Sequence, residues 1–250
     1  MSVKIICPYV NDNEINQQKN RLWNLPVYFE KDHARIGSDM MYQKLWNKFS
    51  NDDIFIMHAD MFPLEDDEDN EWFNNLLEYV EKYPEAGMFG CLLLYPAKDE
   101  NGLFYIQSAG GQFTNGNPDH FGSGLSLDTN GKFKEELLLD EGQFDCIREV
   151  AWTTFGGIYI RRSVFNKIGN FSAGYEWTYN RDVDYCLRAR EAGFKIYQTP
   201  VKLLHYESRD NKEIKAQDPN KVKAEMRNLE TLKSKWANSK FYKTLDEVVN

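Results

Sequence analysis

Short apolar runs alternate with amphipathic stretches over the first hundred residues of the chain. Four runs rich in β-branched and other apolar residues predict buried strands, at 3–7, 25–29, 54–57 and 87–95. Between them, apolar residues three or four positions apart predict a helix behind an N-cap at Ser38 and a second helix over 66–82. This alternation is typical of a largely parallel sheet with helices on both faces, which binds ligands at the carboxyl ends of its strands.

The pattern changes after residue 102. Glycine, asparagine and aspartate are frequent over 102–142, which indicates tight turns and a long excursion from the sheet. Regular elements then resume, and we predict strands at 152–161, 194–198 and 202–205, a short helix capped by Ser163, and helices over 182–192 and 218–236. We therefore expect one α/β domain over residues 1–208, with a helical extension over 209–250 packed on the same domain.

The bulk composition narrows the function classes. The 250 residues carry a formal net charge of −9, which disfavours a nucleic-acid partner because that role needs a basic face. Four cysteines without CxxC spacing predict buried free thiols in a reducing compartment. We expect no signal peptide, and no apolar run approaches the ~18 residues of a membrane span. A cytoplasmic protein is expected, with at most peripheral membrane contact through the lysine-rich face of its last helix.

Two polar side chains follow predicted strands. Asp60 comes after the run at 54–57, and His205 comes after the apolar run at 201–204. Taken alone, Asp60 is typical of a turn residue and His205 of a hydrogen-bonded structural residue. If both lie at one edge of the same sheet, however, the carboxylate and the imidazole could bind a divalent cation.

Asp182 and Asp184 open the predicted helix over 182–192. Acidic residues at the start of a helix are commonly caps that the helix dipole favours, and we expect Asp184 to have this structural role. Asp182 could instead project into the cleft and accept a proton.

Several short motifs follow one another in a characteristic order. They are Cys7-Pro8-Tyr9-Val10-Asn11, His58-Ala59-Asp60, Ser108-Ala109-Gly110-Gly111, His120-Phe121-Gly122, the run from Phe155 to Phe171, Asp182-Val183-Asp184 and His205-Tyr206-Glu207-Ser208. Together they resemble the GT-A fold glycosyltransferases, and more closely family 2 with its rhamnosyltransferase-like and galactofuranosyltransferase-like members. The resemblance covers residues 3–208 and implies an α/β, Rossmann-like and mostly parallel central sheet flanked by helices.

The resemblance also implies a metal-dependent, non-processive transfer of a sugar from a nucleotide-sugar donor, with UDP favoured, to a hydroxyl of a glycan, glycoprotein or lipid-linked acceptor. Asp182 would be the catalytic base, and Asp60 and His205 would bind Mn²⁺ (or Mg²⁺). Attack assisted by a single base predicts inversion at the anomeric carbon. The donor-binding residues would be Pro8, Tyr9, Asn11, Glu30, Asp32, Arg35, His58, Ala59, Gly156 and Gly157. The acceptor-binding residues would be His120, Trp177 and Arg181.

Two positions depart from the family pattern. His58 replaces the first carboxylate of the metal motif, and Arg181 stands where the family usually has glutamate. A cation beside Asp182 would lower the pKa of that carboxyl and weaken it as a base, or it would orient an anionic acceptor. The alternative function is therefore a catalytically impaired sugar-nucleotide or glycan-binding protein of the same fold.

Overall fold

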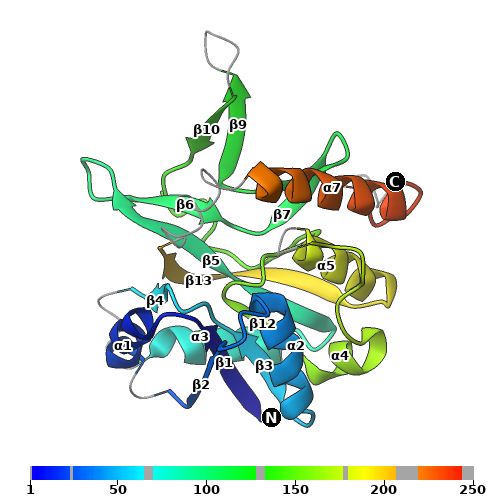
Figure 1. Cartoon of the computed structure of the whole chain (residues 1–250). Helices are drawn as coiled ribbons and strands as arrows, with labels where there is room; N and C mark the ends of the chain where they lie inside the picture. The colour runs from blue at the N-terminus through cyan, green and yellow to red at the C-terminus, as the bar shows by residue number, and fades with distance from the viewer. Residues whose placement is uncertain are drawn as a thin grey trace.

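The computed structural model describes residues 2–22, 25–64, 70–127, 133–176, 180–206 and 219–243. In this part of the chain a nine-stranded sheet forms the centre (Figure 1). Its strands are β1 (Val3–Tyr9), β2 (Val27–Lys31), β3 (Asp53–Ile56), β4 (Met61–Pro63), β5 (Ala86–Lys98), β6 (Phe104–Ser108), β11 (Arg148–Glu149), β12 (Ile158–Ile160) and β13 (Lys195–His205). The main path runs β11-β13-β5-β12-β3-β1-β2, while β4 pairs with β13 and β6 with β5.

The strand directions explain where a ligand can bind. Strands β2, β1, β3, β5 and β13 run in one direction, and β12 lies antiparallel between β3 and β5. The carboxyl ends of β1, β3 and β13 therefore lie at one edge of the sheet. The predicted α/β fold with a mostly parallel central sheet is confirmed.

Helices cover both faces of the sheet. They are α1 (Asp12–Arg21), α2 (Ser38–Lys48), α3 (Glu71–Lys82), α4 (Arg162–Ile168), α5 (Arg181–Glu191) and α7 (Pro219–Trp236). Alternate residues of β3 face opposite sides: Ile54 and Ile56 pack in one core with residues of α2, α4 and α5, and Phe55 packs in another with residues of α3. Each face thus buries its own apolar cluster. None of the described helices is long and apolar enough to cross a lipid bilayer.

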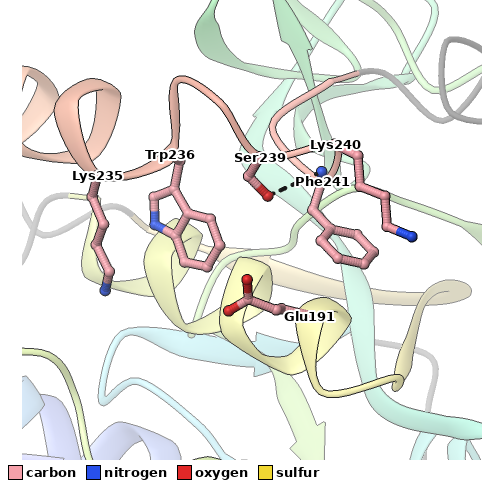
Figure 2. A pocket seen from close by; sticks show the side chains of 6 residues that line it. All are labelled: Glu191, Lys235, Trp236, Ser239, Lys240 and Phe241. Carbon is pink, nitrogen blue, oxygen red and sulfur yellow. Dashed lines mark hydrogen bonds between the residues drawn. The ribbon is translucent and has the colours of Figure 1, made fainter.

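The last described segment packs against the core. Leu232 and Trp236 of α7 are buried in the same cluster as residues of α2 and α5. Arg190 of α5 donates a hydrogen bond of 2.8 Å to the carbonyl of Phe241. Figure 2 shows Trp236 and Phe241 above Glu191 of α5, around a surface pocket of about 460 Å³. This pocket is lined by none of the residues that the sequence motifs single out.

Several local predictions differ from the structure. Helix α1 was not predicted, because it is strongly polar; among its residues with described burial, Ile15 and Gln18 are buried. The predicted excursion over 102–142 contains strands that were not predicted: besides β6 there are β7 (Gly111–Thr114), β8 (Asn117–His120), β9 (Ser123–Leu127) and β10 (Phe133–Leu137), and the paired strands β9 and β10 project from the sheet (Figure 1). The predicted strands at 194–198 and 202–205 form one strand, β13, with a register shift against β5.

Other differences concern caps and cysteines. Gly37, with φ of 93°, precedes α2, so Ser38 is already helical, and Arg161 rather than Ser163 precedes α4. The predicted strand over 152–161 is regular only at Ile158–Ile160. Of the four free cysteines, Cys7, Cys91 and Cys186 are buried, but Cys146 is exposed.

Candidate functional site

His58, Asp60 and His205 form a group whose ligand atoms all lie within 4.8 Å of one another. The Nε2 atom of His205 is 3.4 Å from Nδ1 of His58 and 3.4 Å from Oδ1 of Asp60. With metal–donor bonds of about 2.1 Å, two donors at this separation subtend an angle of about 108° at a shared cation. Such an angle is ordinary for a divalent ion, so two imidazoles and one carboxylate fit a metal site.

Backbone pairing brings these residues together from distant parts of the sequence. The chain leaves β3 with the Met57 amide bonded to Ile6, and then turns so that the Met61 amide donates to the His58 carbonyl. Strand β4 pairs antiparallel with the end of β13, which sets Met61 opposite His205. The Tyr206 amide donates to the Asp60 carbonyl at 3.0 Å. The carboxyl ends of β3 and β13 therefore hold the three side chains in one place.

A closely packed shell fixes the turn that carries His58. The Tyr42 ring is parallel to the His58 ring, with an interplanar angle of 2° and centroids 6.1 Å apart. The side-chain amide of Gln18 donates to the carbonyls of His58 and Met61, at 2.7 and 2.8 Å. A Cβ atom on Gly156 would lie 2.9 Å from Met61 Cε and 3.2 Å from His58 Cε1. Because that space is filled, His58 is held by its neighbours on several sides.

The electrostatic state of the group suits a cation. Burial, and then the adjacent His205, lower the pKa of His58 to about 4. Burial alone would raise the pKa of Asp60, but the hydrogen bond and charge of His205 outweigh it and lower that pKa to about 2. At neutral pH His58 is neutral and Asp60 is ionised, which are the forms that ligate metals. The side chains of His205 and Asp60 are 14% and 15% exposed, so solvent reaches the group.

Asp182 lies in the first turn of α5 and is partly buried. Burial raises its pKa to about 6, and its Oδ1 accepts the Val183 amide at 2.9 Å. The expectation that Arg181 lowers this pKa is wrong. The Arg181 guanidinium turns to Asp39, with an Nη1–Oδ2 distance of 3.1 Å, and also donates to the Tyr175 carbonyl.

Asp184, two residues further on, has a structural role, but it is not the predicted helix cap, since Asn180 precedes the helix and no side chain caps it. It is buried, and it accepts hydrogen bonds from Ser172, Tyr175, Lys235 and Trp236. These contacts fasten α7 to α5.

Helix α2 connects the surroundings of Asp182 with the metal-ligand group. Asp39 and Tyr42 are three residues apart, so they lie on the same face of this helix. Asp39 contacts Arg181, whereas Tyr42 stacks on His58. Burial raises the pKa of Asp39 to about 7, with Asp182 adding to the rise and Arg181 opposing it. One helix therefore contacts both Arg181, the neighbour of Asp182 in sequence, and His58.

The predicted donor-binding residues divide into two sets. Asn11 and Arg35 line a pocket of about 430 Å³ together with Val10, Asp12 and Asn13, beyond the carboxyl end of β1. Pro8 and Tyr9 lie in β1, opposite Glu30 and Lys31 of β2.

Several other residues that we predicted to bind the sugar donor form hydrogen bonds within the protein. Glu30 accepts hydrogen bonds from Tyr28 and Lys44. Asp32 is buried, and its two oxygens accept the amides of Ile36 and Gly37. Gly157 has φ of 64° and its carbonyl accepts the Cys91 amide, which indicates a packing role. Ala59 and Gly156, by contrast, lie directly beside the metal-ligand group.

The two described acceptor residues that we predicted, His120 and Arg181, each contact other side chains of the protein. His120, in β8, has Nδ1 2.9 Å from the hydroxyl of buried Ser108, and its ring meets Trp152 edge to face. Arg181 lies in the Asp39 ion pair. Trp177 is outside the described residues.

Sequence reasoning missed four residues of this site: Gln18, Asp39, Tyr42 and Gln107. The Nδ1 atom of His205 is 2.6 Å from Oε1 of Gln107, a contact across 98 positions of sequence. None of the four lies within a recognised motif. Asp39 is typical of a helix first turn, and Tyr42 of an apolar helix stripe. Gln18 gives no local signal either, because the helix that buries it was not predicted.

Comparisons with known proteins support the fold. No protein-family model matches the chain, and no curated protein matches it. Among solved structures, GalNAc-T7 with UDP, GalNAc and Mn²⁺ aligns with 82% of this chain at a TM-score of 0.52 and 10% identity. The alignment covers 44% of the GalNAc-T7 chain, so this chain corresponds to less than half of that protein. A197 from STIV aligns over 80% of this chain and 83% of its own, at 11% identity and a TM-score of 0.42, which is too low to establish a shared fold.

Proposed function

We propose that this protein is a metal-dependent glycosyltransferase that takes its sugar from a nucleoside-diphosphate sugar. The observation that carries the proposal is the His58–Asp60–His205 group at the carboxyl edge of an α/β sheet of the GT-A type. GalNAc-T7, which shares the arrangement of the chain, binds UDP, GalNAc and Mn²⁺. A UDP-sugar is therefore the favoured donor, and a hydroxyl of a glycan, glycoprotein or lipid-linked acceptor is the favoured acceptor.

The metal-ligand group accounts for how an acidic protein would bind an anionic donor. His58, Asp60 and His205 would hold Mn²⁺ (or Mg²⁺), and no basic phosphate-binding loop is then needed. When bound, the cation supplies Lewis-acid stabilisation of the charge that develops on the leaving diphosphate, worth several kcal/mol. Asn11 and Arg35, in the pocket beyond β1, are positioned to contact the nucleotide, with Pro8 and Tyr9 behind them.

Asp182 is the proposed base. The acceptor oxygen forms a bond to the anomeric carbon, the bond from that carbon to the diphosphate oxygen breaks, and the hydroxyl proton passes to Asp182. A carboxyl with a pKa of about 6 is mostly ionised at neutral pH and is a better proton acceptor than an ordinary aspartate. Such assistance typically contributes ~10²–10⁴ in rate. One base and no second nucleophile predict an inverting, non-processive reaction, with His120, Trp177 and Arg181 toward the acceptor.

The second candidate is a sugar-nucleotide binding protein without turnover. His58 and Arg181 favoured this function at the sequence level, but the pairing of Arg181 with Asp39 removes the reason to expect a weakened base. The two functions are separated by a transfer and hydrolysis assay with UDP-sugars and Mn²⁺. Metal-stimulated turnover that Asp182→Asn reduces at least 100-fold supports the enzyme. Donor binding that requires Mn²⁺, without turnover in the native protein, supports the binding protein.

A further inference from the structure

Gln107 connects the metal-ligand group to the first strand of the 102–142 excursion. It lies in β6, which pairs with β5 and not with the strands that carry His58 or His205. Its side-chain oxygen is 2.6 Å from Nδ1 of His205. The neighbouring residue, Ser108, contacts His120 at 2.9 Å. One short strand therefore reaches both His205 and a predicted acceptor residue.

The chemistry of this contact determines the tautomer of His205. A carbonyl oxygen of an amide only accepts hydrogen bonds, so Nδ1 of His205 must carry the proton. Nε2, which donates to Asp60 when it carries a proton, then presents its lone pair to a cation that displaces this proton. That atom is the one that faces Oδ1 of Asp60 and Nδ1 of His58, at 3.4 Å from each. The other tautomer would direct an N–H toward the position that a cation must occupy.

We propose that Gln107 is a positioning residue of the metal site: its amide oxygen holds His205 in the Nδ1–H tautomer and fixes the ring so that Nε2 ligates the cation. This inference rests on the proposed function in assuming that the group binds a metal. Partners of this kind on ligating histidines typically affect metal affinity 10–100-fold.

The test measures Mn²⁺ affinity of the whole chain by titration calorimetry, without donor or turnover. Gln107→Met removes the acceptor at nearly constant size, and it is expected to weaken Mn²⁺ binding about 10–100-fold. Gln107→Glu supplies a stronger acceptor and is expected to bind Mn²⁺ at least as tightly as the native protein. Gln112→Leu, on the adjacent β7, is the matched control and should not change the affinity.

The outcomes are distinguishable. If Gln107→Met binds Mn²⁺ as tightly as the native protein, or if the Met and Glu variants lose the same affinity for Mn²⁺, Gln107 is not a positioning residue. Neither result contradicts the metal site itself. If the native protein itself does not bind Mn²⁺, the proposed function fails together with this inference. Thermal unfolding of all variants in EDTA checks that they fold, and the order Glu, Gln, Met in Mn²⁺ affinity cannot result from a loss of stability alone.

Discussion

Arg181 forms an ion pair with Asp39, and the two side chains join the first turns of α5 and α2 at an Nη1–Oδ2 distance of 3.1 Å. The side chains of Arg181 and Asp39 are 17% and 9% exposed, so the pair is largely shielded from solvent. A guanidinium next to Asp182 in sequence is thereby directed away from it. The charge that the sequence places beside the candidate base is balanced by a carboxylate from another helix.

Removing Asp39 is expected to expose Asp182 to the charge of Arg181. Asp39→Asn removes the carboxyl that holds the Arg181 guanidinium, which can then turn toward Asp182, and a cation beside Asp182 lowers the pKa of that carboxyl. We expect the acidic limb of the kcat/KM profile to move to lower pH and the rate at neutral pH to fall. Glu149→Gln, which breaks the distant pair with Lys195, is the control and should leave the limb in place. An unchanged limb in Asp39→Asn would show that the ion pair does not act on the base.

The native enzyme is expected to lose activity in acid. Asp182 must be ionised to accept a proton, and burial raises its pKa to about 6. Transfer should therefore fall as the pH drops through about 6, whereas an ordinary aspartate would hold its activity to about pH 4. The profile is measured at saturating Mn²⁺, so that metal loss does not imitate titration of the base. A rate that stays constant down to pH 4.5 would contradict this role for Asp182.

Much of the fold follows from local pattern. The strands near 3–7, 54–57 and 87–95 were predictable because buried β-branched and apolar runs require a covered sheet. Asp60 and His205 were predictable as a pair because each follows a strand that ends at the same edge. His58 was expected to bind the donor ribose or to assist the cation, and the structure groups it with this pair.

The contacts that tune the site were not predictable. Gln107 reaches His205, and Asp39 reaches Arg181, across 98 and 142 positions of sequence. Both contacts depend on how elements far apart in sequence come together in the fold, and hydrophobic periodicity carries no information about that arrangement. Helix α1 was missed for a related reason: it is defined by its Asn11 cap and by buried Gln18, not by an apolar stripe.

Gly156 should be intolerant of a side chain. A Cβ atom there would lie 3.2 Å from His58 Cε1 and 2.9 Å from Met61 Cε, so either His58 or the end of Met61 must move. We expect Gly156→Ala to weaken Mn²⁺ binding about tenfold, since a displaced ligand loses its geometry. Ser163→Ala, in α4, provides the control. If Gly156→Ala binds Mn²⁺ as tightly as the native protein, the Met61 side chain moves to make room for the methyl group and His58 stays in place.

Tyr42 is expected to support both stability and metal binding. Its ring is 2% exposed and parallel to His58. Tyr42→Ala should lower the free energy of unfolding by about 3–5 kcal/mol and also weaken Mn²⁺ binding. Tyr42→Phe keeps the stacked ring and should retain Mn²⁺ affinity, with about 1 kcal/mol lost with the hydroxyl. Urea unfolding and Mn²⁺ titration of both variants provide the measurement. If the Ala variant binds Mn²⁺ as tightly as the native protein, Tyr42 does not support the metal site.

Anomalous diffraction at the manganese edge, from crystals of the native protein soaked with MnCl₂ and UDP, measures the position of the cation directly. We expect one strong peak about 2.0–2.3 Å from His58 Nδ1, His205 Nε2 and a carboxylate oxygen of Asp60, in contact with the diphosphate. The same soak of Asp60→Ala crystals should lack this peak. Diphosphate bound without manganese between residues 58, 60 and 205, or manganese bound elsewhere, would contradict a metal-dependent transferase.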